Sequence, residues 1–253
     1  GIGKTAIVQE VHKPIVRQRG YFIKGKFDQF QRSIPFAAFL QAFQDLIGQL
    51  STESDIQRQT WKTKLLEAVG ENGRVLIDVI PELEQILGEQ PPVPELAATA
   101  AQQRFNLLIQ KFVRVFASAA HPLTIFLDDL QWADLASLNL LQLLMQDTTH
   151  LLFLGPYRDH EVSPIHPTIL TIDEIKKNET AVNTITIQPL SFKDLNQLVA
   201  DTLTCDLDIA EPLAKLVERK TQGNPFFATQ FLKSLYQDGL ITFDPITQNQ
   251  RSG

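Results

Sequence analysis

Apolar positions recur every three or four residues over much of this chain, a spacing that predicts amphipathic helices. Shorter runs that alternate with polar residues, or are continuously apolar, predict strands instead. The predicted helices cover residues 5–16, 35–50, 97–119, 136–146, 191–202, 209–220 and 225–237, with an interrupted helical stretch at 53–87. The predicted strands cover residues 21–27, 123–127, 151–157 and 183–188. Strands and helices therefore alternate up to residue 188, and helices alone follow.

This change of pattern at Pro189 predicts a boundary between two structural units. The runs at 123–127 and 151–157 are continuously apolar, which is typical of strands buried on both faces of a parallel sheet. We therefore predict an α/β domain over residues 1–188 and a small helical subdomain over residues 189–237. Between the last two strands, residues 160–166 are predicted to form a loop and residues 173–178 an exposed polar stretch.

Composition and charge narrow the class of protein. The 253 residues are 43% hydrophobic and 21% charged, as in globular proteins, and Cys205 is the single cysteine, which excludes an intrachain disulfide. A net charge of −6 argues against a broad surface for nucleic acid. No apolar run approaches the roughly 18 consecutive residues that a membrane-spanning helix needs.

The first candidate chemistry is the opening GIGKT, which matches the end of the phosphate-binding pattern G-x-x-x-x-G-K-[ST]. Glycine lets backbone N–H groups wrap a phosphate, Lys4 neutralises its charge, and the Thr5 hydroxyl holds Mg²⁺. The first glycine of the pattern and the strand that feeds the loop would precede Gly1, so we expect the chain to begin inside the motif. The alternative is an ordinary glycine-rich turn before a helix.

The second candidate is the pair Asp128 and Asp129, delivered by the apolar run at 123–127. The first acid of such a pair orients Mg²⁺, and the second is placed to polarise an attacking water. The alternative is a turn in which Asp129 or Asp134 merely caps a helix. The two motifs occur along the chain in the order typical of nucleotide-binding domains. Open α/β sheets bind ligands at the carboxyl ends of their strands, which is where both motifs are predicted to lie.

Two weaker candidates lie further along the chain. Arg158 follows the strand at 151–157 and is suited to sensing a phosphate, or alternatively to pairing with Asp159 or Glu161. Asn224 and Pro225 open a predicted helix, which by spacing alone requires no functional explanation. The five histidines show no spacing typical of metal ligands.

Taken together, these motifs resemble a known family. The strings GIGKT, LTIFLDDLQWAD, LLFLGPYRDHE and QGNPFF, with the segment at 27–36, are similar to AAA-type P-loop ATPases of the signalling (STAND) class. The closest likeness is to the ATPase segment of bacterial multi-sensor serine/threonine and histidine kinases. The resemblance covers nearly the whole chain. It implies a P-loop core with a parallel sheet, a helical lid, and a winged-helix-like region that begins within residues 238–253.

The resemblance also implies a role for individual residues. Asp129 would be the catalytic acid and Arg158 the sensor residue, while Asp128 would hold the metal together with Thr5. The nucleotide would be bound by Gly1, Gly3, Lys4, Thr5 and Pro225, the last packing on the adenine.

The function implied is Mg²⁺-dependent ATP binding with slow hydrolysis, used as a conformational switch inside a large cytoplasmic signalling kinase. The expected partners are ATP, neighbouring kinase and sensor domains of the same polypeptide, and a second copy of the chain, with neither nucleic acid nor membrane. One alternative is an interaction module that keeps the fold but works without nucleotide. Another is the ATPase domain of a transcriptional regulator, which the winged-helix-like start favours and the acidic charge opposes.

Overall fold

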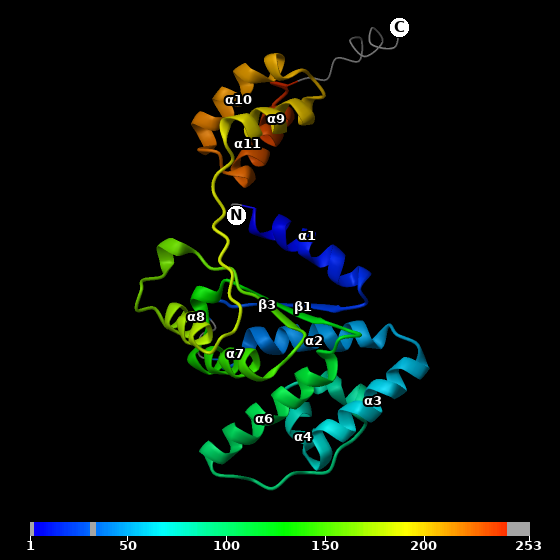
Figure 1. Ribbon diagram of the computed structural model, residues 1–253. Coiled ribbons are helices and arrows are strands. Elements are labelled where there is room, and N and C mark those ends of the chain that lie inside the picture. The colour runs from blue at the N-terminus through cyan, green and yellow to red at the C-terminus, as the bar shows by residue number, and fades with distance from the viewer. Residues whose placement is uncertain (1–2, 31–33, 242–253) are drawn as a thin grey trace. The chain divides into compact units, whose positions relative to one another are not determined.

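The computed structural model describes residues 3–30 and 34–241. Its strands form one parallel sheet in the order β1 (Tyr21–Lys26), β2 (Leu123–Asp128) and β3 (Leu151–Leu154), flanked by helices (Figure 1). In the ladder, Tyr21 and Leu151 both pair with Leu123. The strands run in step, so their carboxyl ends reach the same edge of the sheet. The α/β class predicted from the sequence is confirmed.

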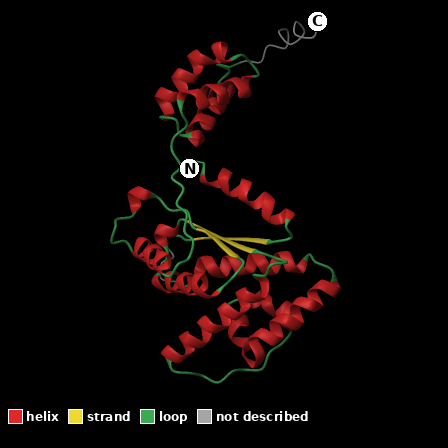
Figure 2. Ribbon diagram, viewed as in Figure 1, coloured by secondary structure: helices red, strands yellow, loops and turns green. Residues whose placement is uncertain are grey.

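The chain divides into two compact units, each described here by itself. One comprises Val11–Asn183, and the other comprises the described parts of Gly1–Glu10 and Thr184–Gly253. All three strands belong to the first unit (Figure 2). The domain limits at residues 188 and 237 stay a prediction, and most of the predicted winged-helix-like region, residues 242–253, lies outside the described residues.

The sheet packs most closely against α2 (Ala37–Ser51). A Cβ built on Gly25 of β1 would lie only 1.9 Å from the carbonyl oxygen of Ala38, so this contact requires glycine. On the opposite face of β1, the ring of Phe22 lies 4.8 Å from that of His12 in α1 (Lys4–Arg17). The buried residues of α2 are Ala38, Phe39, Ala42, Phe43, Leu46, Ile47 and Leu50, which include most of the apolar positions that predicted this helix.

A helical layer follows α2 and forms the interrupted stretch predicted from the sequence. It consists of α3 (Asp55–Val69), α4 (Gly73–Ile77), α5 (Glu84–Leu87) and α6 (Ala98–Phe116), with short 3₁₀ turns between them. Glu53, just before α3, ties this layer to the sheet. Its carboxylate accepts hydrogen bonds from the Tyr21 hydroxyl (2.6 Å) and from the Trp61 indole N–H (2.8 Å).

Two helices flank β3 in the chain, and the sequence predicted only the first. The predicted helix at 136–146 is α7 (Leu135–Asp147), and the second is α8 (Pro167–Lys177), which packs on α7. The polar stretch predicted at 173–178 is therefore mostly helix. His166 caps α8 and Pro167 occupies its first turn, and within this helix only Thr168 and Ile175 are buried.

The strand predicted at residues 183–188 is wrong. The segment is not paired with any strand of the described chain, and Ile185 is 77% exposed. Its alternation of apolar and polar residues suits a strand, but a strand also needs a hydrogen-bonding neighbour and a face to bury. The segment has neither.

After residue 189, the described residues form the three helices predicted from the sequence, which are α9 (Phe192–Leu203), α10 (Leu207–Thr221) and α11 (Pro225–Gln237). The hydroxyl of Ser191 caps α9 by accepting the Asp194 N–H. The helices enclose a small core of their own, formed by Leu195, Val199, Ala200, Ala210, Ala214, Val217, Ala228 and Leu232. Among the helices in the described ranges, none combines the length and apolar character needed to cross a membrane.

Candidate functional site

The candidate site in the larger unit begins where β1 and β2 end. In the strand register, Lys26 lies opposite Asp128 at the last position of the ladder, and the Phe27 N–H donates to the Asp128 carbonyl oxygen (3.1 Å). Asp128 is half-buried, and its carboxylate accepts the backbone N–H of Asp129 (2.9 Å). The continuous apolar run of β2 therefore carries Asp128 to the carboxyl edge of the sheet, as its position in the sequence predicted.

Asp129 is buried, with 3% of its surface exposed, and its backbone is left-handed with φ 54°. Such a backbone costs an ordinary residue roughly 1–2 kcal/mol, although aspartate tolerates it better than most. Its side chain makes no capping hydrogen bond to the 3₁₀ turn that follows it, Leu130–Trp132. The cap of α7 is instead Asp134, which accepts the Ser137 N–H at 2.8 Å. Of the two capping alternatives, only the one for Asp134 is therefore observed.

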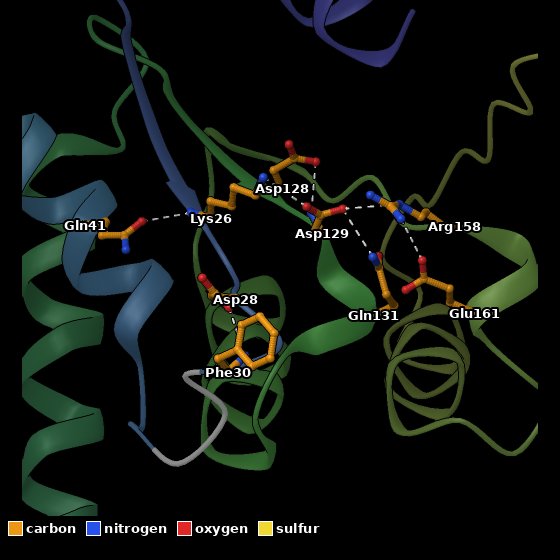
Figure 3. A network of polar contacts seen from close by, with 9 residues as sticks. All are labelled: Lys26, Asp28, Phe30, Gln41, Asp128, Asp129, Gln131, Arg158 and Glu161. Carbon is orange, nitrogen blue, oxygen red and sulfur yellow. Dashed lines mark hydrogen bonds and ion pairs between the residues drawn. The ribbon is translucent and has the colours of Figure 1, made fainter. Parts of the chain in front are cut away.

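Charged and polar groups from three segments surround the Asp129 carboxylate (Figure 3). Lys26 Nζ, from the end of β1, lies 3.3 Å from Oδ2. Arg158 Nε, from the segment after β3, lies 3.7 Å from Oδ1, and the Gln131 amide donates to the same oxygen at 3.2 Å. A buried carboxylate stays ionised only when such partners replace its lost hydration.

Arg158 contacts two carboxylates, those of Asp129 and Glu161. Besides Asp129, it reaches Glu161, with Nη1 2.8 Å from Oε1, so the surface pairing considered as an alternative is also present. Its guanidinium lies 5.5 Å from the ring centre of Trp132. The backbone brings this segment close to the acids, because the Leu130 N–H donates to the Pro156 carbonyl oxygen (3.0 Å).

Gln131 is 2% exposed, and its amide oxygen Oε1 has no hydrogen-bond partner among the described residues. The contact with Asp129 fixes this orientation, because a flipped amide would place its oxygen against Oδ1 of Asp129. A buried polar atom without a partner costs roughly 1–3 kcal/mol. Gln131 therefore supports Asp129 at some expense to stability, a pattern typical of functional sites.

The smaller unit holds the remaining candidate residues. Gly3 precedes α1 with φ 103°, Lys4 is the first residue of that helix and Thr5 the second, while Gly1 lies outside the described residues. A Cβ built on Gly3 would lie 3.8 Å from Cγ of Pro225. The start of α11 therefore lies against the backbone of the candidate phosphate loop, although the two are far apart in sequence.

The turn before Pro225 has a clear local cause. Gly223 has φ 72°, and a Cβ there would lie 2.5 Å from the carbonyl oxygen of Leu190. Asn224 caps α11 by accepting the N–H groups of Phe226 (3.0 Å) and Phe227 (3.4 Å), and Pro225 takes the first helical position. This sequence therefore fixes the direction in which α11 starts, next to Gly3.

The structure thus gathers Asp128, Asp129 and Arg158 at one edge, and separately gathers Gly3 with Pro225. Sequence reasoning missed Lys26 and Gln131. The predicted strand at 21–27 could have placed Lys26 at this edge, since parallel strands end at the same edge of a sheet, but its contact with Asp129 depends on the strand register. For Gln131 the sequence carries no comparable signal.

The oxygen donors of the larger unit suit Mg²⁺ bound together with phosphates. Among the residues that the structure describes, no group of three or more His, Cys, Asp or Glu side chains could hold a metal ion. Mg²⁺ in nucleotide sites needs no such cage, because it keeps several waters and uses one or two carboxylates plus phosphate oxygens. The half-buried carboxylate of Asp128 fits that requirement.

Comparison with known proteins places this site in a family. Residues 1–154 match the family model of the AAA ATPase domain. The chain is 27% identical to hybrid signal transduction histidine kinase G of Dictyostelium discoideum, over 98% of this chain and 9% of that protein. It is 26% identical to histidine protein kinase 1 of Candida albicans, over 56% of this chain and 6% of that protein.

The chain thus spans only a small part of the length of these curated relatives. No solved structure matches it. The family match extends over more than half of the chain and includes GIGKT, β1, β2 and the acids that follow β2. The chain therefore belongs to the AAA ATPase domain family.

Proposed function

We propose that this domain binds ATP with Mg²⁺, hydrolyses it slowly, and uses the nucleotide state as a conformational switch in a larger signalling protein. The observation that carries the proposal is the meeting of Asp128, Asp129 and Arg158 at the carboxyl edge of a parallel sheet. This is where ligands bind in open α/β folds. The family match adds nucleotide binding as the general activity.

In this proposal, each of the residues that the sequence motifs single out has a role in binding. The main-chain N–H groups of Gly1 and Gly3 and the ammonium of Lys4 hold the phosphates, and Thr5 and Asp128 supply oxygen ligands to the metal. The bound Mg²⁺–ATP supplies a phosphoryl group whose negative charge the metal partly neutralises. Pro225 packs on the base, which its place beside Gly3 supports.

Asp129 and Arg158 act on hydrolysis. Asp129 Oδ accepts the proton of the attacking water, a role that needs a buried, ionised and oriented carboxylate. Its burial and its ionic partners support this. Arg158 lies between Asp129 and Glu161, so a phosphate that competes for its guanidinium changes both ion pairs. The site thereby converts nucleotide state into a change of contacts.

The setting is also a proposal. The two relatives are named as histidine kinases, which supports a parent protein with kinase and sensor domains that are partners of this one. Within it, the domain acts as a STAND-type module of two-component signalling in the cytoplasm. The helical segment at 189–237 is its lid.

Binding of a fluorescent ATP analogue tests the proposal, measured on the natural polypeptide that carries these residues. Because kinases also bind ATP, the informative quantity is the binding lost in Lys4→Ala but kept in Lys13→Ala, an exposed lysine of the same helix. We expect such a Lys4-dependent share with Mg²⁺ present. Equal binding by wild type and Lys4→Ala would instead favour an interaction module that works without nucleotide.

A further inference from the structure

Lys26 and Arg158 both contact the buried carboxylate of Asp129, and Lys26 is the nearer of these two side chains. Its ammonium lies 3.3 Å from Oδ2, whereas Arg158 Nε lies 3.7 Å from Oδ1. Arg158 is also shared with Glu161, at the shorter distance of 2.8 Å. Lys26 is therefore the closer counter-ion, and it contacts a different carboxylate oxygen from Arg158 and Gln131.

The backbone holds Lys26 in register with the acids. Its own N–H donates to Gln41 Oε1 of α2 (3.0 Å), and its Cα is paired with that of Asp128 (Figure 3). Gly25, the residue before it, lies in close contact with the carbonyl of Ala38 in the same helix. The end of β1 is thus anchored to α2, and Lys26 cannot shift along the sheet independently of β2.

Burial differs sharply between the two partners. The side chain of Lys26 is 62% exposed, and that of Asp129 is 5% exposed. Exposed lysines gain little stability from an ion pair, because water screens the charge and the long side chain loses entropy. Asp129 is the buried partner, so Lys26 replaces part of the hydration that this carboxylate has lost, and its contact with Oδ2 also orients the carboxylate.

We propose that Lys26 is a positioning residue for hydrolysis, which holds Asp129 Oδ2 so that the carboxylate faces the nucleotide phosphates in a fixed orientation. This rests on the proposed function, since it assigns Asp129 the task of accepting a proton from water. Lys26 acts through Asp129 alone, and nucleotide binding does not depend on it.

The test compares wild type, Lys26→Met, Lys26→Arg and the control Lys24→Met. Two quantities are measured: nucleotide affinity, and Lys4-dependent phosphate release, which is the release of phosphate from ATP that is lost in Lys4→Ala. Lys24 lies two residues earlier on the same face of β1 and is exposed. We expect Lys26→Met to lower the rate about tenfold or more, because small misplacements of a reacting group have effects of that size. Affinity for ATP should change less than about twofold, Lys26→Arg should recover most of the rate, and Lys24→Met should match wild type.

A double variant decides whether Lys26 acts through Asp129. In an Asp129→Asn background, Lys26→Met should cause no further loss of rate. A rate for Lys26→Met equal to that of Lys24→Met, or a full additional loss in the Asp129→Asn background, would overturn the role of Lys26 and leave the ATPase function standing. No Lys4-dependent phosphate release in wild type would overturn both.

Discussion

Gly223 shows how a single residue sets the geometry at the start of α11. Its φ of 72° is unfavourable for other residues, and a Cβ would lie 2.5 Å from the Leu190 carbonyl oxygen. We expect Gly223→Ala to lower the free energy of unfolding of the helical unit by about 2 kcal/mol or more, the sum of backbone strain and overpacking. Chemical denaturation followed by circular dichroism measures this.

Gly48 is the matched control, since it lies exposed in α2 with no atom within 4 Å of a built Cβ. Gly48→Ala should raise the free energy of unfolding of the larger unit, to which α2 belongs, by about 0.5–1 kcal/mol, because alanine favours helix. If Gly223→Ala were as stable as Gly48→Ala, the close approach of Gly223 to Leu190 would not exist in solution.

At the residue scale, the sequence predicts where a side chain at the end of a strand lies, but it does not predict which side chain of a neighbouring strand will contact it. Asp128 and Asp129 follow an apolar run, so their place at the edge of the sheet could be inferred. The contact of Lys26 with Asp129 depends on the pairing of β1 with β2, and a shift of one residue would turn its side chain to the other face. Register is a tertiary property.

Among the elements, β1 and α3 are joined through the carboxylate of Glu53. Burial and the hydrogen bond to Glu53 raise the pKa of Tyr21 well above its ordinary value of 10.0. Above pH 10.0 the unfolded chain has lost a proton that the folded chain retains, so stability falls as pH rises. We expect Tyr21→Phe to lose about 1 kcal/mol near neutral pH and to show a shallower alkaline decline.

Denaturant titrations at a series of pH values from about 8 to about 11 measure this decline. Tyr236→Phe, which replaces a tyrosine that is 68% exposed, is the control and should keep the slope of wild type. Parallel curves for wild type and Tyr21→Phe would show that the Tyr21 hydroxyl is not held by Glu53.

The elements themselves were mostly predictable, and the two failures share a cause. For both α8 and residues 183–188, the structure that forms depends on which parts of the fold pack against the segment. The second half of α8 is polar and mostly exposed, so the sequence indicates an exposed stretch and not a helix, whereas residues 183–188 alternate clearly but lack a neighbouring strand in the described chain. Apolar periodicity in a sequence indicates that one face of an element is buried, and whether that face finds a partner depends on the rest of the fold.

For the whole molecule, the motifs that resemble one nucleotide site fall in two compact units. Lys4 and Pro225 belong to one, and Asp128, Asp129 and Arg158 to the other. The sequence order of these motifs suggested a common ligand, which the proposal takes to be ATP. A ligand that binds one conformation of a protein better than another shifts the population toward that conformation, which is the basis of a switch.

Phosphate release by Asp129→Asn, measured together with nucleotide binding, tests the central claim most directly. The variant keeps the shape of the side chain but removes the proton acceptor, and Asp173→Asn on the exposed face of α8 is the control. We predict Lys4-dependent release in wild type and Asp173→Asn, and a loss of about 100-fold or more in Asp129→Asn with binding retained. Undiminished release by Asp129→Asn, or no Lys4-dependent release by wild type, would contradict it.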